Sequence, residues 1–518
     1  VQAPMAARAE APRPPGSSEF QVWSARPQRG AATDLASGGT LGGVLGAPLV
    51  SCGGVIRGNG DAVGGGRDSA AAPEALALFR HGIGLTTDLY DLTVVNAVRI
   101  EFEATYGKLT PWENGAITSA SHMGAIVGQL SFGYLADRIG RRSALLGTSC
   151  ITCLAAAGAA ATVPMGSLSA AQVMTIWRFM LGIGIGGEYP LSGAVTAEHA
   201  SSQASAMHLA VLTLCFLMGQ ILSPLVVLAC IYCGASEEAT WRLGIAGGAL
   251  LALVGAVVRV RSLRESEAWL EAEAAARLQS SSMGLLNRAT LRAVARPLAG
   301  TVLSWCVYDI VGYGTGGYTT TLFKADSRTG TLWNVLLVVA LSAPGYFFTL
   351  CVGRFGRRCF QLTGFAVMGL AFFLMSSLYG SGMGTVELFI FGIQKSFDAF
   401  GPGAMTFMIP AEIFPTAMRA SCHGASAAGG KLGAFIGTFL LPPFQEAFGM
   451  RAVLACCGVL SFVGALLTVF LTPPYAARTL RELQQATKTD PSRTTDILWA
   501  KPAGHGCLAP GAAPECVL

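Results

Sequence analysis

Charged side chains are scarce in this sequence of 518 residues. Asp, Glu, Lys and Arg together make up 13% of it, whereas soluble domains carry about 25%. Apolar residues account for 52%, and glycine, which is common where membrane helices pack closely, occurs 65 times. So few charges cannot cover a surface that faces water. The composition therefore excludes an ordinary soluble protein and indicates a chain embedded in a lipid bilayer.

The residue patterns of enzymes and metal proteins are also missing. The sequence contains no nucleophile–base set, and Cys230 and Cys233 lack the second pair or the histidines that a zinc site needs. The glycine-rich run over 182–187 follows no strand, so we do not interpret it as a nucleotide-binding loop. The net charge of +5 gives no indication of a nucleic-acid partner. We expect no enzyme, no metal, no cofactor and no nucleic acid.

Apolar stretches of about twenty residues follow one another from Leu76 to Leu471, each long enough to cross about 30 Å of hydrocarbon as a helix. The longest polar interruption, about 261–296, divides them six and six. We therefore predict an all-α membrane protein with twelve transmembrane helices in two six-helix halves. The predicted spans lie near residues 76–98, 114–136, 143–163, 171–195, 206–232, 242–260, 296–322, 332–352, 361–380, 385–410, 424–445 and 451–472.

The corresponding domain organisation has five parts. Residues 1–72 are expected to be a disordered tail and 73–262 the N-terminal half. A cytoplasmic central loop over 263–295, which could form a short surface helix, leads to the C-terminal half over 296–473. Residues 474–518 are expected to be a polar cytoplasmic tail.

Basic side chains gather in loops that all fall on one side if the spans alternate. By the positive-inside rule that side is the cytoplasm, and both termini lie there. We expect a multi-pass protein of the plasma membrane, with an organelle membrane as the alternative. The loops over 133–142 and 353–358 repeat the same pattern, which implies a duplication with the solute site between the halves.

The first of these loops, Gly133-Tyr-Leu-Ala-Asp137-Arg138-Ile-Gly140-Arg141-Arg142, resembles the hallmark of the major facilitator superfamily. Further stretches resemble its phosphate:proton symporter branch, and the resemblance covers about 76–472. It implies the major facilitator fold and alternating access, with the hallmark loop as a gating latch. The stretches are 87–91, 186–192, 305–313, 361–365 and 410–433.

The resemblance also implies roles for individual residues. First-span carboxylates matching Asp88 and Asp91 serve proton coupling in that family. The sequence departs from the pattern at Phe216 and Gly403, where polar contacts to the anion are usual, and at Gly353, where an Asp is usual. The positions matching the family's phosphate site are Glu188, Tyr189, Trp305, Asp309, Tyr313 and Lys431.

The residues support a site at some of these positions without any family. A charge inside hydrocarbon is costly and persists mainly where it faces a polar cavity. Trp305, Asp309 and Tyr313 recur every four residues and share one helix face. Lys431 needs an anionic partner, either Asp309 or a bound anion, unless it snorkels to the surface. An anion bound beside Asp309 or Glu188 would favour proton uptake by that carboxyl, which gives symport a physical basis.

Two groups of polar residues stay open. Lys395 and Asp398, three apart in the tenth predicted span, are not predicted by the family pattern. They either neutralise each other or supply part of an altered substrate site. His122 and His423 are expected to be satisfied by neighbouring helices.

We therefore expect a secondary active transporter that moves inorganic phosphate or a related oxyanion together with protons. An organic anion or sugar carrier is the alternative, favoured by Phe216, Gly403 and a sugar-carrier-like stretch over 264–270. A nutrient sensor that binds the solute without transporting it is an alternative of a different class.

Overall fold

The computed structural model describes residues 67–199, 205–262, 265–278, 288–316, 325, 327–382, 384–474, 485 and 497–498. All of them belong to one compact unit, residues 65–518. Within these residues the regular elements are helices, and the only β pairing is an isolated bridge between Met165 and Leu168. The predicted tail over 1–72 lies almost wholly outside the described residues.

The first six predicted spans are confirmed as helices. The first begins at Arg67, inside the predicted tail. A short helix, α2 (Arg99–Tyr106), follows it, and α8 (Glu267–Leu278) forms the short helix predicted in the central loop. The spans are α1 (Arg67–Ala97), α3 (Pro111–Ile139), α4 (Arg141–Ala160), α5 (Ala170–His199), α6 (Ser205–Tyr232) and α7 (Glu237–Ser262).

The second six spans are helical as well, with two departures from simple rods. The tenth is broken between α14 and α15 by a π-helical turn over Ala399–Gly403 that contains Pro402. The last two run on as α16, which bends at Gly449, where φ is 81°. The elements are α9 (Arg288–Gly316), α11 (Arg328–Phe348), α12 (Val352–Phe355), α13 (Arg357–Leu378), α14 (Gly384–Asp398), α15 (Ala404–Ile413) and α16 (Arg419–Leu471).

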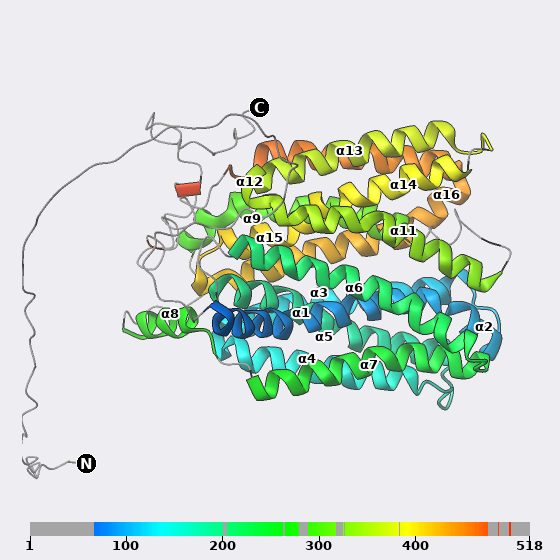
Figure 1. Cartoon of the computed structure of the whole chain (residues 1–518), viewed down its shortest axis with the longest axis horizontal. Coiled ribbons are helices and arrows are strands. Elements are labelled where there is room, and N and C mark those ends of the chain that lie inside the picture. The colour runs from blue at the N-terminus through cyan, green and yellow to red at the C-terminus, as the bar shows by residue number, and fades with distance from the viewer. Residues whose placement is uncertain are drawn as a thin grey trace, which may run out of the picture. The chain divides into compact units, whose positions relative to one another are not determined.

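The helices of each half lie side by side. In Figure 1 the helices from α1 to α7 occupy the lower part of the bundle and those from α9 to α16 the upper part. The short helices α2 and α8 lie at opposite ends of it. Across the boundary α3 packs against α16, and α6 packs against α11.

The transmembrane helices differ in how apolar they are. Six described segments are long and apolar enough to cross a membrane by themselves, and they belong to α4, α6, α7, α11, α13 and the last part of α16. Of the other spans, α1, α5, α9, α14 and the first part of α16 carry the intramembrane charges singled out by the sequence, and α3 carries His122. Charges inside hydrocarbon normally face the bundle interior, so these spans are expected to line the interior.

Part of the C-terminal tail contacts the bundle. Leu498 is 1% exposed and belongs to the main hydrophobic cluster, and Ile497 packs against the same cluster. Within the predicted polar tail over 474–518, these two apolar residues therefore pack against the helices.

Close approach of α3 and α5 depends on glycine. A Cβ atom at Gly128 would lie 2.1 Å from the backbone oxygen of Ile183, far inside van der Waals contact. Small residues allow membrane helices to pack closely in this way. In the glycine-rich run of α5, a Cβ atom at Gly182 would lie 2.1 Å from the backbone oxygen of Ser121, so this run serves helix packing, as its context in the sequence indicated.

We predict that Gly128→Val lowers the thermal unfolding midpoint of the purified protein, because overpacking costs about 1–3 kcal/mol. Gly115→Val is the control on the same helix, since nothing lies within 4 Å of a Cβ atom there. Equal midpoints for the two variants in a detergent-solubilised melting assay would contradict this account of the α3–α5 interface.

Candidate functional site

A cavity of about 660 Å³ lies between the two halves. It extends from the middle of the bundle to the ends of α1 and α11, where Glu101 and Arg328 form part of its wall. The centre is lined by α1, α3, α5 and α6 on one side and by α9, α11, α14, α15 and α16 on the other. The central side chains are Leu89, Thr93, His122, Tyr189, Phe216, Gln220, Trp305, Tyr308, Asp309, Tyr313, Tyr346, Lys395, Asp398, Phe407 and Lys431.

A buried ion pair forms one wall. The Lys431 ammonium group lies 3.1 Å from Oδ2 of Asp309 and donates to the Tyr313 hydroxyl at 2.9 Å. Lys431 is 1% exposed, so it does not snorkel to the surface. Asp309 is the anionic partner that the sequence suggested, and the predicted Trp305–Asp309–Tyr313 face does line the cavity.

Helix packing brings this pair together. A Cβ atom at Gly433 would lie 2.0 Å from the backbone oxygen of Cys306, so α16 can approach α9 this closely only without a side chain there. Gly430 in the same way faces the Trp305 indole. The small residues on either side of Lys431 therefore set its distance from Asp309.

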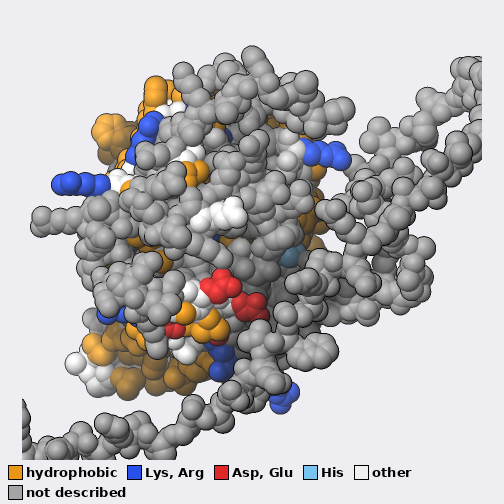
Figure 2. Space-filling view, turned by 90° about the vertical axis from the view of Figure 1, so that its left-hand side faces the viewer, with side chains coloured by type: hydrophobic (Ala, Val, Ile, Leu, Met, Phe, Trp, Pro, Cys, Tyr) orange, Lys and Arg blue, Asp and Glu red, His pale blue; other side chains and the backbone are white. Residues whose placement is uncertain are grey.

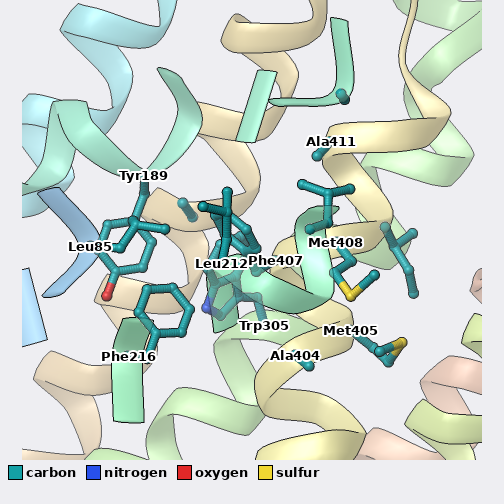
Figure 3. Close-up of a cluster of buried hydrophobic side chains, with 14 of the residues drawn as sticks. Leu85, Tyr189, Leu212, Phe216, Trp305, Ala404, Met405, Phe407, Met408 and Ala411 are labelled. Atoms are coloured by element: carbon teal, nitrogen blue, oxygen red, sulfur yellow. The ribbon is translucent and has the colours of Figure 1, made fainter. Parts of the chain in front are cut away.

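Aromatic rings form the adjoining wall. Tyr189 and Phe216 stack with ring centroids 5.6 Å apart, and Phe407 meets both rings edge-on. Figure 3 shows Tyr189 and Phe216 beside each other, with Phe407 and Trp305 next to them. The Lys431 ammonium lies 5.5 Å from the centre of the Tyr189 ring. Phe216 therefore contributes an apolar surface where the family pattern would place an amide.

Glu188 does not line the cavity, although its neighbour Tyr189 does. Its carboxylate pairs with the buried Arg259 of α7, which donates from both terminal nitrogens, and accepts a 2.7 Å hydrogen bond from Ser192. Thr148 adds a longer contact of 3.4 Å. The structure thus surrounds Glu188 with protein donors, and its side chain does not form part of the cavity wall.

Asp88 and Asp91 lie behind the cavity wall rather than in it. They are 2% and 1% exposed, and Oδ2 of each has no hydrogen-bond partner. One helical turn before Asp88, Gly84 packs against the carboxylate of Glu188 and the guanidinium of Arg259. Asp91 packs against Gly248 of α7, where an added Cβ atom would meet its carboxylate.

At the end of the bundle that carries the repeated basic loops, Asp137 joins the two halves. Its carboxylate accepts hydrogen bonds from Arg141 at 2.7 Å and from the backbone N–H and hydroxyl of Ser421 in α16. Arg141 also donates to the backbone oxygen of Thr416, and the Trp269 indole of α8 donates to that of Asp137. This cross-half contact is the arrangement that a latch requires.

The other hallmark residues support that contact. Gly140 turns the chain between α3 and α4 with φ of 95°, and the Glu265 carboxylate accepts from the backbone N–H groups of Arg141 and Arg142. Arg138 is exposed and stacks on Tyr134. Gly133 lies against the backbone oxygen of Ala420 in α16. Figure 2, seen from the end where α8 lies, shows Lys and Arg side chains at several places around this face and acidic ones near its middle.

The repeated loop of the second half uses a different acid. Gly356 makes the same turn, with φ of 82°, but Gly353 stands where the first loop has Asp137. Arg357 instead forms a two-pronged pair with Glu412, at 2.7 and 3.0 Å. The duplication therefore keeps a buried arginine pair in both halves.

Two polar groups remain beside the central pair. Lys395 and Asp398 pair at 2.9 Å and both line the cavity. His122 lines it too, with its ring 4.7 Å from that of Tyr313. The expectation that the two histidines are satisfied by neighbours is wrong, because Nδ1 of His122 and both ring nitrogens of His423 have no hydrogen-bond partner.

At the far rim of the cavity Arg328 connects the halves. It lies 2.9 Å from Glu237 of α7 and 3.7 Å from Glu101 of α2. Burial raises the pKa of the Glu101 carboxyl above its usual range, and the Arg328 guanidinium opposes that shift. The pair with Glu237 is exposed, so it contributes little to stability.

The sequence did not point to Arg259 or Ser421. Arg259 lies near the end of the sixth span, where an arginine is ordinarily a topology signal. Ser421 has no distinctive pattern around it. A buried glutamate at the centre of α5 was the only sign that a cationic partner was needed.

The fold resembles solved structures of major facilitator transporters. A major facilitator superfamily proton:xylose symporter, XylE, bound to 6-bromo-6-deoxy-D-glucose, superimposes with a TM-score of 0.69 at 19% identity, over 80% of this chain and 99% of the other. The human organic anion transporter MFSD10 (TETRAN) gives 0.56 at 17% identity, over 76% and 99%. The chain is thus a twelve-helix membrane protein of the major facilitator fold.

The sequence comparisons narrow this class. The model of the family described as "Sugar (and other) transporter" matches residues 83–486, so the chain belongs to that family. Among its curated relatives are the repressible high-affinity phosphate permease of Neurospora crassa and inorganic phosphate transporter 1-1 of Arabidopsis thaliana. The former is 28% identical over 78% of this chain and 85% of the relative, and the latter 26% identical over 79% and 94%.

We predict that Glu188→Gln lowers the unfolding midpoint sharply, because an uncompensated buried Arg259 costs about 3–5 kcal/mol. The double variant Glu188→Gln/Arg259→Met should recover most of the loss. A single variant that stays as stable as wild type would show that the pair is not the main role of Glu188 and would favour its predicted part in coupling.

We predict that Asp137→Asn separates the halves at the basic-loop end. Losing a charged hydrogen bond costs about 1.5–3 kcal/mol, so the open population should rise roughly tenfold or more. Spin labels at Ile139 and Phe355, both exposed at that end, would report the distance by pulsed electron paramagnetic resonance. Arg138→Ala, a change in the same loop at an exposed side chain, is the control. An unchanged distance distribution for Asp137→Asn would argue against the latch.

Proposed function

We propose that the protein is a secondary active transporter that carries inorganic phosphate, or a related oxyanion, together with protons by alternating access. The observation that carries this proposal is the cavity between the halves with Lys431 and Asp309 paired in its wall. The phosphate permease and phosphate transporter named above support the substrate, and the named proton:xylose symporter has the same fold.

The proposed anion site consists of Lys431, Tyr313, Trp305 and Tyr189. These side chains line one part of the cavity and offer an ammonium group, two hydroxyl groups and an indole N–H. In this proposal Glu188 does not contact the substrate. It has a structural role as the partner of Arg259. Asp88 and Asp91 remain proposed coupling residues, since each is buried with an oxygen that lacks a partner.

Coupling would follow from charge. Lys431 and Asp309 neutralise each other, so an anion that approaches Lys431 adds negative charge beside a buried carboxylate. Protonation of Asp309 removes that repulsion and frees the ammonium for the anion. Anion and proton therefore each strengthen the binding of the other, by the same factor.

Under this proposal the cavity opens toward one particular side of the membrane. The halves are joined at the basic-loop end through Asp137 and Ser421, whereas the cavity reaches the opposite rim. If the basic loops are cytoplasmic, as the positive-inside rule proposes, the cavity faces outward and both termini lie inside the cell. The proposed site is the plasma membrane, and an organelle membrane remains the alternative.

A sugar or organic anion carrier is the second candidate. Phe216 and Gly403 remove two polar contacts from the cavity, and the described organic anion transporter shares the fold. A sensor that does not transport would bind the solute without accumulating it.

We predict that purified protein in proteoliposomes accumulates ³²P-phosphate, and that an inward proton gradient increases the accumulation. Asp309→Asn, which cannot exchange a proton, should lose at least about nine-tenths of the gradient-dependent part, equivalent to about 1.4 kcal/mol of coupling or more. Glu446→Gln, an exposed acid on α16 outside the cavity, is the matched control. Accumulation that Asp309→Asn retains would contradict the coupling role, and binding without accumulation would favour the sensor.

A further inference from the structure

The cavity is larger than the proposed phosphate site needs. Its volume of about 660 Å³ is in the range of pockets that enclose drug-sized ligands, roughly 300–1,000 Å³. The anion site around Lys431 uses one part of its wall. A second polar group, which we call the α14 cluster, lines another part and consists of Gln220, Tyr308, Tyr346, Lys395 and Asp398.

The two groups are neighbours. Tyr308 and Asp309 are consecutive in α9, and both line the cavity. Consecutive residues on a helix point about 100° apart, so one helix presents Asp309 to the anion site and Tyr308 to the α14 cluster. The two groups therefore adjoin along α9 within one cavity.

The α14 cluster has an unfilled acceptor. Oδ2 of Asp398 accepts from Lys395 at 2.9 Å, but its buried Oδ1 has no hydrogen-bond partner. A buried acceptor without a donor is unfavourable by about 1–3 kcal/mol. A ligand that supplies a donor would remove this penalty.

Gly403 lies directly against this part of the cluster. A Cβ atom there would lie 2.8 Å from the backbone oxygen of Asp398, 2.9 Å from the Tyr308 hydroxyl and 3.3 Å from Oδ1 of Asp398, so only a glycine lets these groups pack here. Across the cavity Gln220 donates to the Tyr346 hydroxyl at 2.9 Å. A ligand hydroxyl group that reaches Tyr308 and Asp398 from the cavity would find both a donor and an acceptor, which is how polar sites recognise alcohols.

The charge of the cluster favours a neutral group. Lys395 and Asp398 balance each other, with side chains 17% and 7% exposed. A second anion would be repelled by Asp398, whereas a hydroxyl group would not. An ion pair at this depth is seldom needed for stability alone, because apolar residues often serve as well.

We propose that the substrate is a phosphomonoester of a small polyol or sugar, with its phosphoryl group at Lys431 and its hydroxyl groups at the α14 cluster. This inference rests on the proposed function, since it takes the anion site around Lys431 as given.

The test compares uptake of glycerol 3-phosphate and glucose 6-phosphate with that of inorganic phosphate in proteoliposomes. We expect at least one ester to be accumulated and to compete for transport at a concentration at least tenfold lower than phosphate. The ratio of ester to phosphate affinity should fall at least tenfold in Lys395→Met/Asp398→Leu, which removes both charges together. Gln220→Leu, a change of one uncharged side chain, should lower it as well if the double variant does not fold. Glu387→Gln, an acid of α14 outside the cavity, is the control.

The outcomes separate the two proposals. Phosphate uptake without transport of, or competition by, either ester would overturn the inference and leave the proposed function standing. A ratio unchanged in both variants would assign the cluster a structural role, and it would overturn the inference even if esters are carried. Uptake of free glycerol or glucose, or no uptake of phosphate or ester by folded protein, would overturn both.

Discussion

The contact between Lys431 and Asp309 is the constraint on which the rest of the site depends. Two opposite charges lie 3.1 Å apart in the middle of a membrane bundle, each at most 2% exposed. An unpaired charge buried this deeply is costly, so each charge of the pair stabilises the ionised form of the other. The pair fixes which faces of α9 and α16 meet, and the absence of a side chain at Gly433 makes the meeting possible. The same contact therefore sets both the charge balance of the site and the packing of α9 against α16.

The buried ion pairs fall into two groups, those enclosed by helices and those that line the cavity. Glu188 with Arg259, Asp137 with Arg141 and Arg357 with Glu412 are pairs that lie outside the cavity wall. They hold helices to one another, and Asp137 also joins the two halves through Ser421. The Lys431–Asp309 pair also connects two helices, but like Lys395–Asp398 it faces the cavity. A charge pair that faces a cavity is available to a ligand, whereas one enclosed by helices is not.

The sequence indicated residues of the cavity wall where a charged residue stood within an apolar span. Charges within apolar spans predicted Asp309 and Lys431, and the spacing of Trp305, Asp309 and Tyr313 predicted their shared face. The environment of Glu188 could not be predicted, because its partner Arg259 lies 71 residues away and resembles an ordinary basic residue at a span end. The unpartnered histidines also depend on contacts between helices that no local pattern specifies. The break at Pro402, by contrast, lies in a Gly-Pro-Gly stretch, which is a local signal for interrupting a helix.

The two lysine–aspartate pairs of the cavity differ in one respect that matters for the proposed mechanism. Lys431 and Asp309 are each at most 2% exposed, so a negative charge brought beside them needs a compensating positive charge, and a proton on Asp309 would supply it. Lys395 is 17% exposed and Oδ1 of its partner has no hydrogen-bond partner, so a hydroxyl group can bind there without any change of charge. The more deeply buried pair is thus suited to coupling and the more exposed pair to recognition. Their nearness, through Tyr308 and Asp309, would let one molecule engage both.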